Sequence, residues 1–255
     1  MIYIYVDTIK AKSLLDVSRH LKGNVKYVAL KPNMTIPANA EMVGVSGVLR
    51  GNRAIIKQAI DRGIPWIYVD NGYLGTYRRV TLSSTTPTRF KDGKRFEHHT
   101  KLKPWRGGQG DNILILPPSP SYMDTFGLRD FLNDCVHTLN QYTDRQIVVR
   151  GKPFKDRKAP DLQKQLNEAY AVVSWGSAVS LEALRQGIPT ISLGWCPAKY
   201  STFAFEDLDT DKLLSEPPRI ETFDNLTWSS YRRRELHLAA TELFENNFKF
   251  DDYQP

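Results

Sequence analysis

The stretch 170–194, YAVVSWGSAVSLEALRQGIPTISLG, decides the fold of this chain of 255 residues. A short apolar run at 171–173 is typical of a buried strand, and it ends in the small polar turn 174–177. The next residues, 178–186, have helical spacing and precede a glycine. A second apolar run, 188–194, then starts another strand. The pattern predicts a strand, a tight turn, a short helix and a further strand.

A turn of this kind presents backbone N–H groups and small hydroxyls at a helix N-terminus, where an anion binds well. Ser174, Gly176 and Ser177 form the turn. Glu182 follows in the first turns of the helix, where a carboxylate can accept hydrogen bonds from ribose hydroxyls. We therefore expect a nucleotide site. The alternative is an ordinary βαβ unit whose small residues only permit close helix–sheet packing.

The order of small polar turn, Glu-Ala-Leu at 182–184, Gly-Ile-Pro at 187–189 and a β run resembles the donor half-site of GT-B glycosyltransferases. Their relatives, the UDP-sugar epimerases and capsule-polysaccharide transferases, share it. The resemblance implies an α/β fold of two small Rossmann-like domains facing a cleft, with a C-terminal helix crossing back to the first domain. It also implies a nucleotide-sugar donor, most simply a UDP-sugar, and no tightly bound cofactor.

The composition is sufficient for a hydrophobic core, because 41% of the residues are hydrophobic. No stretch approaches 18 consecutive apolar residues, and the first residues lack a signal-peptide layout. We therefore expect a soluble, cytoplasmic protein without a transmembrane segment. The two cysteines, Cys135 and Cys196, lie far apart and outside any metal-ligand spacing, so we expect two buried thiols in a reducing compartment.

Strands alternate with helices along most of the chain, which favours parallel sheets covered by helices. We expect domains at 1–110 and 111–225, with a basic loop at 85–110, and a helical tail at 226–255 whose helix spans 228–244. The other expected strands are 1–7, 25–30, 41–48, 64–70, 112–116 and 146–150, and the other expected helices are 10–21, 53–62, 124–142 and 161–169.

Two cations follow a predicted strand directly, so they should emerge at the ligand-binding edge of the second domain. Arg150 and Lys152 are expected to neutralise a leaving diphosphate, with Ser119 meeting it from the opposite side. The sequence has no acidic motif at a position where it is expected to bind a metal ion, so we prefer a metal-independent mechanism. Alternatively, both cations belong to a surface loop.

A carboxylate at the end of the fourth predicted strand is the candidate catalytic base. Asp70 would deprotonate an acceptor hydroxyl, as an inverting transferase requires. The alternative is turn chemistry, because Asp70 begins the turn formers Asp-Asn-Gly. Asp7 is the second choice for the base, and the neighbouring His98 and His99 are another.

A net charge of +7 favours a polyanionic partner, and the stretch 89–106 interleaves cations with Phe90, Phe96 and Trp105. The stretch 66–80 resembles small GT-B-like proteins encoded by bacteriophages, which implies glycosylation of hydroxymethylated pyrimidines in phage DNA. The cations expected to contact DNA are Arg78, Arg79, Lys94, Arg95, Lys101 and Arg106.

Three functions remain open at this point. The preferred one is transfer of a sugar from a nucleotide sugar to hydroxymethylated DNA. The second keeps the fold and changes the acceptor to a surface polysaccharide or a lipid-linked glycan, since a basic surface also suits anionic lipids. The third is a non-catalytic α/β protein that binds nucleic acid and has lost its nucleotide site.

Overall fold

The computed structural model describes residues 1–7, 12–48, 51–85, 94–151, 161–194 and 197–245, with the side chains of 200 and 243–245 left out. The chain divides into two compact units. Unit 1 comprises residues 1–96 and 225–255, and unit 2 comprises residues 97–224. Each unit has its own sheet with helices around it, which confirms the α/β class. Among the described residues, no helix is long and apolar enough to cross a membrane.

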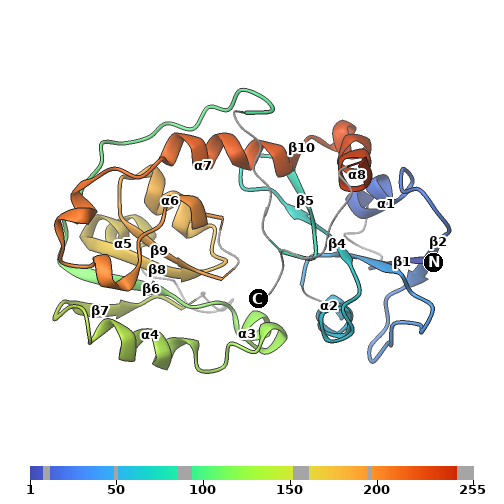
Figure 1. Cartoon of the computed structure of the whole chain (residues 1–255), viewed down its shortest axis with the longest axis horizontal. Coiled ribbons are helices and arrows are strands. Elements are labelled where there is room, and N and C mark those ends of the chain that lie inside the picture. The colour runs from blue at the N-terminus through green and yellow to red at the C-terminus, as the bar shows by residue number, and fades with distance from the viewer. Residues whose placement is uncertain (8–11, 49–50, 86–93, 152–160, 195–196, 246–255) are drawn as a thin grey trace. The chain divides into compact units, whose positions relative to one another are not determined.

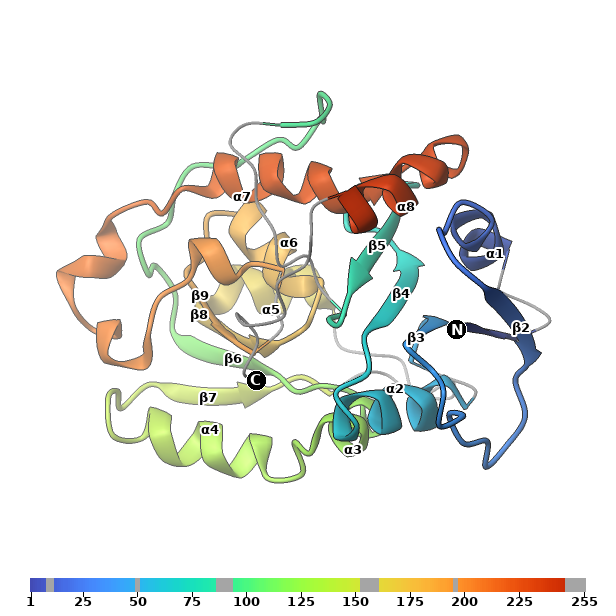
Figure 2. The ribbon, with the colours of Figure 1, turned by 45° about the vertical axis from the view of Figure 1, so that its right-hand side comes forward.

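The sheet of unit 1 has six strands in the order β10-β5-β4-β3-β1-β2. Strands β2, β1, β3 and β4 run parallel, whereas β5 is antiparallel to β4 and β10 is antiparallel to β5. Figure 2 shows β4 and β5 side by side. The strands are β1 (Ile2–Val6), β2 (Val25–Ala29), β3 (Met42–Ser46), β4 (Trp66–Asn71), β5 (Arg78–Leu82) and β10 (Ser230–Tyr231).

The core of unit 1 joins the two ends of the chain. Helix α1 (Lys12–Ser18) lies beside α8 (Leu236–Glu245) in Figure 1. Leu14 and Val17 of α1 pack with Leu236, Ala239 and Ala240 of α8 against the strand residues of the sheet. The C-terminal helix therefore completes the first unit, as the family resemblance implied. Helix α2 (Asn52–Asp61) connects β3 to β4.

The sheet of unit 2 is entirely parallel, in the order β7-β6-β8-β9. Its central strands are apolar and fully buried over most of their length, as expected for a sheet covered on both faces. Figure 1 shows the four strands surrounded by helices. The strands are β6 (Asn112–Leu116), β7 (Gln146–Val149), β8 (Ala169–Trp175) and β9 (Thr190–Leu193).

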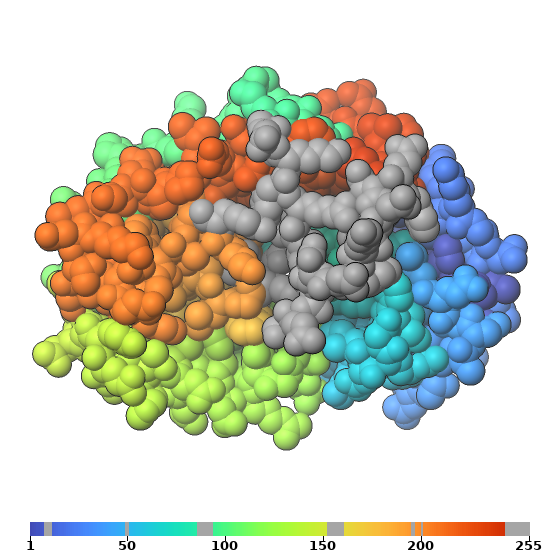
Figure 3. Space-filling view, viewed as in Figure 1, coloured from blue at the N-terminus to red at the C-terminus, as the bar shows by residue number. Residues whose placement is uncertain are grey.

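The two faces of this sheet have different covers. Helices α5 (Leu162–Glu168) and α6 (Val179–Arg185) cover one face through Leu166 and Ala183. Helix α4 (Phe131–Leu139) and the segment 197–218 cover the other, and both reach the surface in Figure 3. The remaining elements are α3 (Pro120–Phe126), α7 (Arg219–Leu226) and the 3-10 turns Lys199–Ser201, Phe205–Asp207, Asp211–Leu214, Thr227–Ser229 and Arg233–Glu235.

Two expected helices differ from the structure, and one strand was not expected. The helix expected over 124–142 is two helices, α3 and α4, because Gly127 takes a left-handed conformation (φ 69°) and ends α3. The tail helix begins at Leu236 instead of 228, because Ser230 and Tyr231 pair with β5. Strand β5 itself was not expected. The units divide after Phe96, inside the expected loop 85–110, and within α7 after Asp224, next to the expected boundary at 225.

Candidate functional site

The best-placed ligand site in unit 2 is the point where its sheet topology changes direction. The chain passes from β6 to β7 on one side of β6, and then crosses to β8 on the other side. The carboxyl ends of β6 and β8 are therefore neighbours, with Leu116 paired to Ser174. Ligands of open parallel sheets bind at such a switch point, because the loops leave it in opposite directions.

The turn after β8 has the expected conformation. Gly176 takes φ 62°, and the Ser177 hydroxyl accepts the Val179 N–H at 3.2 Å. The Ser177 carbonyl accepts the Ser180 hydroxyl at 2.6 Å. Gly176 and Ser177 are half-buried, whereas Ser174 is fully buried in the strand. The accessible part of the predicted turn is therefore Gly176 and Ser177, and Ala178 after it is exposed.

The turn after β6 lies at the neighbouring strand end. Ser119 follows Pro117 and Pro118 and immediately precedes α3. Its carbonyl accepts the N–H groups of Tyr122 and Met123, while its half-buried side chain makes no capping bond. The topology thus brings Ser119 to the same sheet edge as Gly176 and Ser177, although these residues are more than fifty positions apart in the sequence.

Of the two predicted diphosphate cations, the structure describes one. The Arg150 N–H donates to the Ile115 carbonyl at 2.9 Å, so Arg150 lies at the carboxyl end of β7. Its guanidinium also contacts the Gln165 side chain on α5. Lys152 lies outside the described residues. Arg150 therefore reaches the expected edge of the sheet, one strand away from the switch point.

Glu182 is a charged, half-exposed carboxylate on α6. It accepts hydrogen bonds from Arg185 at 2.5 and 2.8 Å and from the Gln186 amide at 2.6 Å. The Arg185 hydrogen bonds are the main cause that lowers the pKa of Glu182, so the group is ionised at neutral pH. Its Oε2 accepts one of these bonds and has a further lone pair for a ligand hydroxyl.

Asp70 belongs to a cation–aromatic cluster in unit 1. Its Oδ2 accepts the Tyr68 hydroxyl at 2.7 Å and Arg79 Nη2 at 3.1 Å, while its Oδ1 accepts the Asn71 N–H at 2.8 Å. The Arg79 guanidinium lies 5.2 Å from the Tyr68 ring centre and 4.6 Å from that of Tyr73. Burial raises the pKa of the Tyr68 phenol well above its usual value, so Tyr68 remains a donor to Asp70.

Asp7 stands at the switch point of the other sheet. In unit 1 the chain passes from β1 to β2 and then crosses to β3 on the opposite side of β1. Asp7 directly follows β1 and is half-buried. Asp70 is the second-last residue of β4, the strand beyond β3. By topology both expected carboxylates are at the carboxyl edge of the same sheet.

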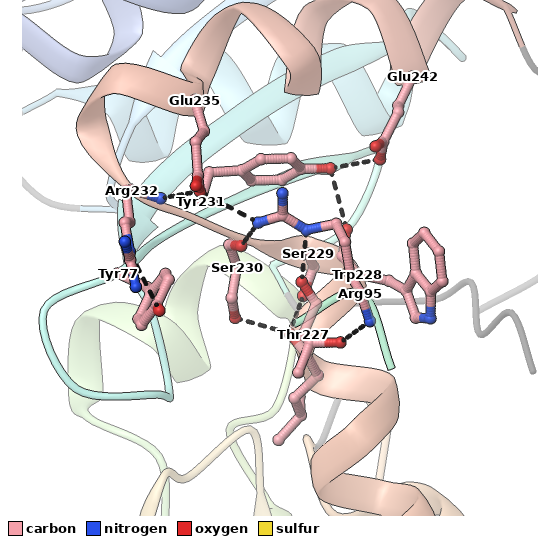
Figure 4. A network of polar contacts seen from close by, with 11 residues as sticks. Tyr77, Arg95, Thr227, Trp228, Ser229, Ser230, Tyr231, Arg232, Glu235 and Glu242 are labelled. Atoms are coloured by element: carbon pink, nitrogen blue, oxygen red, sulfur yellow. Dashed lines mark hydrogen bonds and ion pairs between the residues drawn. The ribbon is translucent and has the colours of Figure 1, made fainter. Parts of the chain in front are cut away.

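Arg95 is held inside unit 1 by backbone and side-chain contacts (Figure 4). Its Nε donates to the Thr227 carbonyl at 3.1 Å and its Nη2 to the Ser230 carbonyl and to Glu235. It also lies 4.6 Å from the Tyr231 ring centre. Only 14% of the side chain is exposed, so Arg95 fastens the segment before the domain boundary to the returning chain.

Arg106 has a comparable role in unit 2. Its guanidinium donates to the carbonyls of Leu166, Asn167 and Ala169 at 2.9, 2.8 and 3.3 Å. These carbonyls lie at the C-terminal end of α5, where a cation is favourable. The predicted DNA contacts Arg79, Arg95 and Arg106 are thus committed to internal partners, whereas Lys94 and Lys101 are exposed.

His98 is held by a carboxylate in unit 2. Its Nε2 lies 2.9 Å from Asp224 Oδ1, and only 13% of its side chain is exposed. His99 is more exposed. Among the residues whose placement is described, no group of three His, Cys, Asp or Glu side chains is positioned to hold a metal ion.

Sequence reasoning missed the aromatic part of the Asp70 cluster. Tyr68 was detectable, because residues two apart on a strand share a face. Tyr73 and Arg79 depend on the β4–β5 hairpin, which pairs Asp70 with Arg79. Since β5 was not expected, no sequence signal connected these side chains to the carboxylate.

Comparisons with known proteins give only distant structural similarity. No family model and no curated protein matches this chain. It is similar to the β-Kdo 2,4 transferase KpsC of Thermosulfurimonas dismutans, with a TM-score of 0.43 and 13% identity over 88% of this chain and 89% of that one. A protein of Listeria monocytogenes named as a UDP-N-acetylglucosamine 2-epimerase gives a TM-score of 0.27 and 13% identity over 100% and 99%. Because both scores lie below 0.5, function has to be inferred from the residues of this chain.

Proposed function

We propose that this protein is a glycosyltransferase that moves a sugar from a nucleotide sugar, a UDP-sugar in the first instance, to an acceptor hydroxyl. Unit 2 binds the donor and unit 1 supplies the base. The observation that carries the proposal is the switch point of unit 2, where the Ser119 turn and the Gly176–Ser177 turn occupy adjacent strand ends. Ionised Glu182 on the helix after the second turn supplies a ribose acceptor.

The transfer step follows from these groups. The acceptor oxygen attacks the anomeric carbon while Asp70 Oδ1 takes the hydroxyl proton. The bond from the anomeric carbon to the phosphate oxygen breaks, and its electron pair leaves with the nucleoside diphosphate. Arg150 and Lys152 stabilise the added negative charge, which makes a metal ion unnecessary. Asp70 Oδ1 suits this role because it accepts only one described hydrogen bond, whereas Oδ2 accepts two.

The proposed acceptor is the hydroxyl of a hydroxymethylated pyrimidine in DNA. The net charge of +7 supports a polyanionic acceptor. A hydroxyl borne on a base inside a duplex must be turned out of the stack before it reaches a carboxylate. A surface glycan is the second candidate, since a basic surface attracts other polyanions too.

The transfer reaction is tested directly with a panel of UDP-sugars and duplex DNA that contains 5-hydroxymethylated pyrimidines. After digestion to nucleosides, mass spectrometry is expected to show a sugar-sized gain on the modified nucleoside. Binding of UDP without any gain moves the acceptor to a glycan. Absence of both UDP binding and transfer contradicts the proposal and leaves the non-catalytic alternative.

Glu182→Ala is expected to raise the Kd for UDP by roughly tenfold to a hundredfold, because a hydrogen bond to a charged group contributes about 1.5–3 kcal/mol. Isothermal titration with UDP measures the change. Arg185→Ala is the matched control, since it removes the ion-pair partner of Glu182 and leaves the carboxylate in place. Equal weakening by both variants would mean that helix α6, and not the Glu182 carboxylate, is what UDP binding requires.

A further inference from the structure

Three consecutive arginines that the proposed chemistry does not use lie at the edge of the unit 1 sheet. Arg232 to Arg234 follow β10, whose Tyr231 pairs with Arg78 of β5. This pairing brings Arg232 to Tyr77, the residue before Arg78. The Arg232 guanidinium lies 5.7 Å from the Tyr77 ring centre, and its Nε donates to the Tyr77 hydroxyl at 3.3 Å.

Tyr77 is itself part of a longer stack. Its ring lies parallel to that of Phe96, with 4.5 Å between centres and 6° between planes. The Arg95 guanidinium lies 5.0 Å from the Phe96 ring centre. Arg232, Tyr77, Phe96 and Arg95 thus form a cation–aromatic–aromatic–cation stack. Because the rings restrain these long side chains in the free protein, less conformational entropy is lost when an anion binds.

The carboxylates of this surface are already paired. Glu235 binds Arg95, and Asp16 binds Arg233. Within the described part of the chain, Arg78, Arg232 and Arg234 make no ion pair; Arg78 contacts the neutral Asn71 side chain. Arg232 and Arg234 are exposed and Arg78 is half-buried. Among the described residues these three guanidinium groups have no ion-pair partner, although the Glu235 carboxylate, which Arg95 already pairs, also attracts Arg232.

We propose that Arg78, Arg232 and Arg234 bind the phosphodiester backbone of DNA. The inference rests on the proposed DNA acceptor and is independent of the transfer chemistry. A guanidinium donates two parallel hydrogen bonds to the free oxygens of a phosphate. Tyr77 and Phe96 stack on each other and each ring also faces an arginine, so this surface contacts phosphates instead of stacking on bases. Its binding is expected to be independent of sequence and sensitive to salt.

The charge density of the surface favours DNA over an acidic glycan. Duplex DNA carries one negative charge per about 1.7 Å of its axis. Consecutive residues such as Arg232 to Arg234 place their Cα atoms only about 3.8 Å apart. A glycan with at most one carboxylate per sugar offers fewer charges to such a cluster, so a dense polyanion gains more from it.

The test compares two double variants of the full-length protein. Arg232→Gln with Arg234→Gln removes two exposed charges, of which Arg232 is the exposed end of the stack. Lys22→Gln with Lys26→Gln removes two exposed charges at the opposite edge of the same sheet, next to and on β2. Binding of a fluorescein-labelled DNA duplex of about 20 base pairs is followed by anisotropy at several salt concentrations. Polygalacturonate is the competing acidic glycan.

The arginine variant is expected to lower the slope of log K against log salt by about 2, one per lost phosphate contact. Its Kd should rise on the order of tenfold or more at about 0.1 M salt, while the lysine variant stays near the parent. The single variant Arg234→Gln is expected to lower the slope by about 1 and guards against a folding defect.

Two results would overturn the inference. Equal weakening of DNA binding by both double variants would show that the affinity for DNA depends only on the net charge of the protein. Failure of the parent to bind duplex, with polygalacturonate binding lost in the arginine variant, would make the surface a glycan site. The proposed transfer fails separately, through loss of UDP binding, which neither double variant is expected to change.

Discussion

The two carboxylate oxygens of Asp70 have different surroundings. Oδ2 accepts two hydrogen bonds from side chains of unit 1, whereas Oδ1 accepts one described hydrogen bond and can still take a proton. Its Oδ2 balances the charge of Arg79, whose side chain is only 12% exposed and whose Nε is buried without a partner among the described residues. An arginine in this position needs a nearby carboxylate, because an uncompensated buried charge is costly. A structural role and a catalytic role are therefore compatible at this residue.

Asp70→Asn is expected to lower the rate of sugar transfer by about 10²–10⁴, the usual contribution of a general base, with UDP affinity unchanged. Single-turnover transfer and UDP titration separate the two effects. Tyr68→Phe is the control, because it removes one hydrogen bond to Oδ2 and leaves Oδ1 untouched. Full activity in Asp70→Asn together with loss in Asp7→Asn would assign the base to Asp7.

Single residues show the limit of prediction from the sequence. A carboxylate at a strand end can be found from the apolar run before it, and so Asp70 was expected. Its partner Arg79 lies across a hairpin in a strand that begins with two arginines and shows little alternation. A strand of this composition is determined by its neighbours in the sheet, which a local pattern does not contain.

Helices were predictable where spacing and end signals agree. Helix α6 has apolar residues on one face and closes at Gly187, and it forms as expected. The stretch 228–235 also has helical character, but pairing of Ser230 and Tyr231 with β5 limits it to two 3-10 turns and prevents a continuous α-helix there. The partners in that pairing, Arg78 and Arg79, are far away in the sequence. The local periodicity of 228–235 therefore does not indicate the pairing.

Gly187→Ala is expected to destabilise unit 2 by about 3 kcal/mol or more. The left-handed conformation (φ 78°) costs an alanine about 1–2 kcal/mol, and the new Cβ would lie 2.1 Å from the Pro104 carbonyl oxygen. Gly127→Ala is the matched control. Gly127 also ends a helix, with φ 69°, but no atom lies within 4 Å of an added Cβ. This variant is therefore expected to lose only about 1 kcal/mol of unfolding free energy. Urea unfolding measures both. Equal losses of stability in the two variants would show that the segment at Pro104 shifts to make room for the new Cβ at little cost.

At the scale of the whole molecule, one unit is continuous in sequence and the other is not. Unit 2 is one uninterrupted stretch, whereas unit 1 combines residues 1–96 with 225–255. The division after residue 96 lies inside the loop region 85–110 in which the boundary was expected, but its position within that loop was not predictable, because residues 97–110 have no apolar period. They join unit 2 through backbone bonds, with Lys103 N–H on the Arg185 carbonyl and Arg106 N–H on the Gly187 carbonyl.

A fragment of residues 97–226, which keeps α7 whole, is expected to unfold cooperatively and to bind UDP with the affinity of the full chain. Its buried clusters on both sheet faces are formed by its own residues. Circular dichroism with urea and UDP titration measure this. The complementary truncation to residues 1–224 removes Leu236, Ala239 and Ala240 from the unit 1 core and should leave that unit unfolded. A fragment that binds UDP only when unit 1 is present would contradict the assignment of the donor to unit 2.

The return of α8 to the first sheet also sets an order of events on the ribosome. Residues 1–96 are made before residues 97–224, but their core lacks α8 until residues 236–245 are synthesised. Residues 97–224 are complete earlier and need nothing further to close their sheet. Residues 97–224 therefore reach their native state before residues 1–96 do, and residues 1–96 remain exposed to chaperones and proteases for longer.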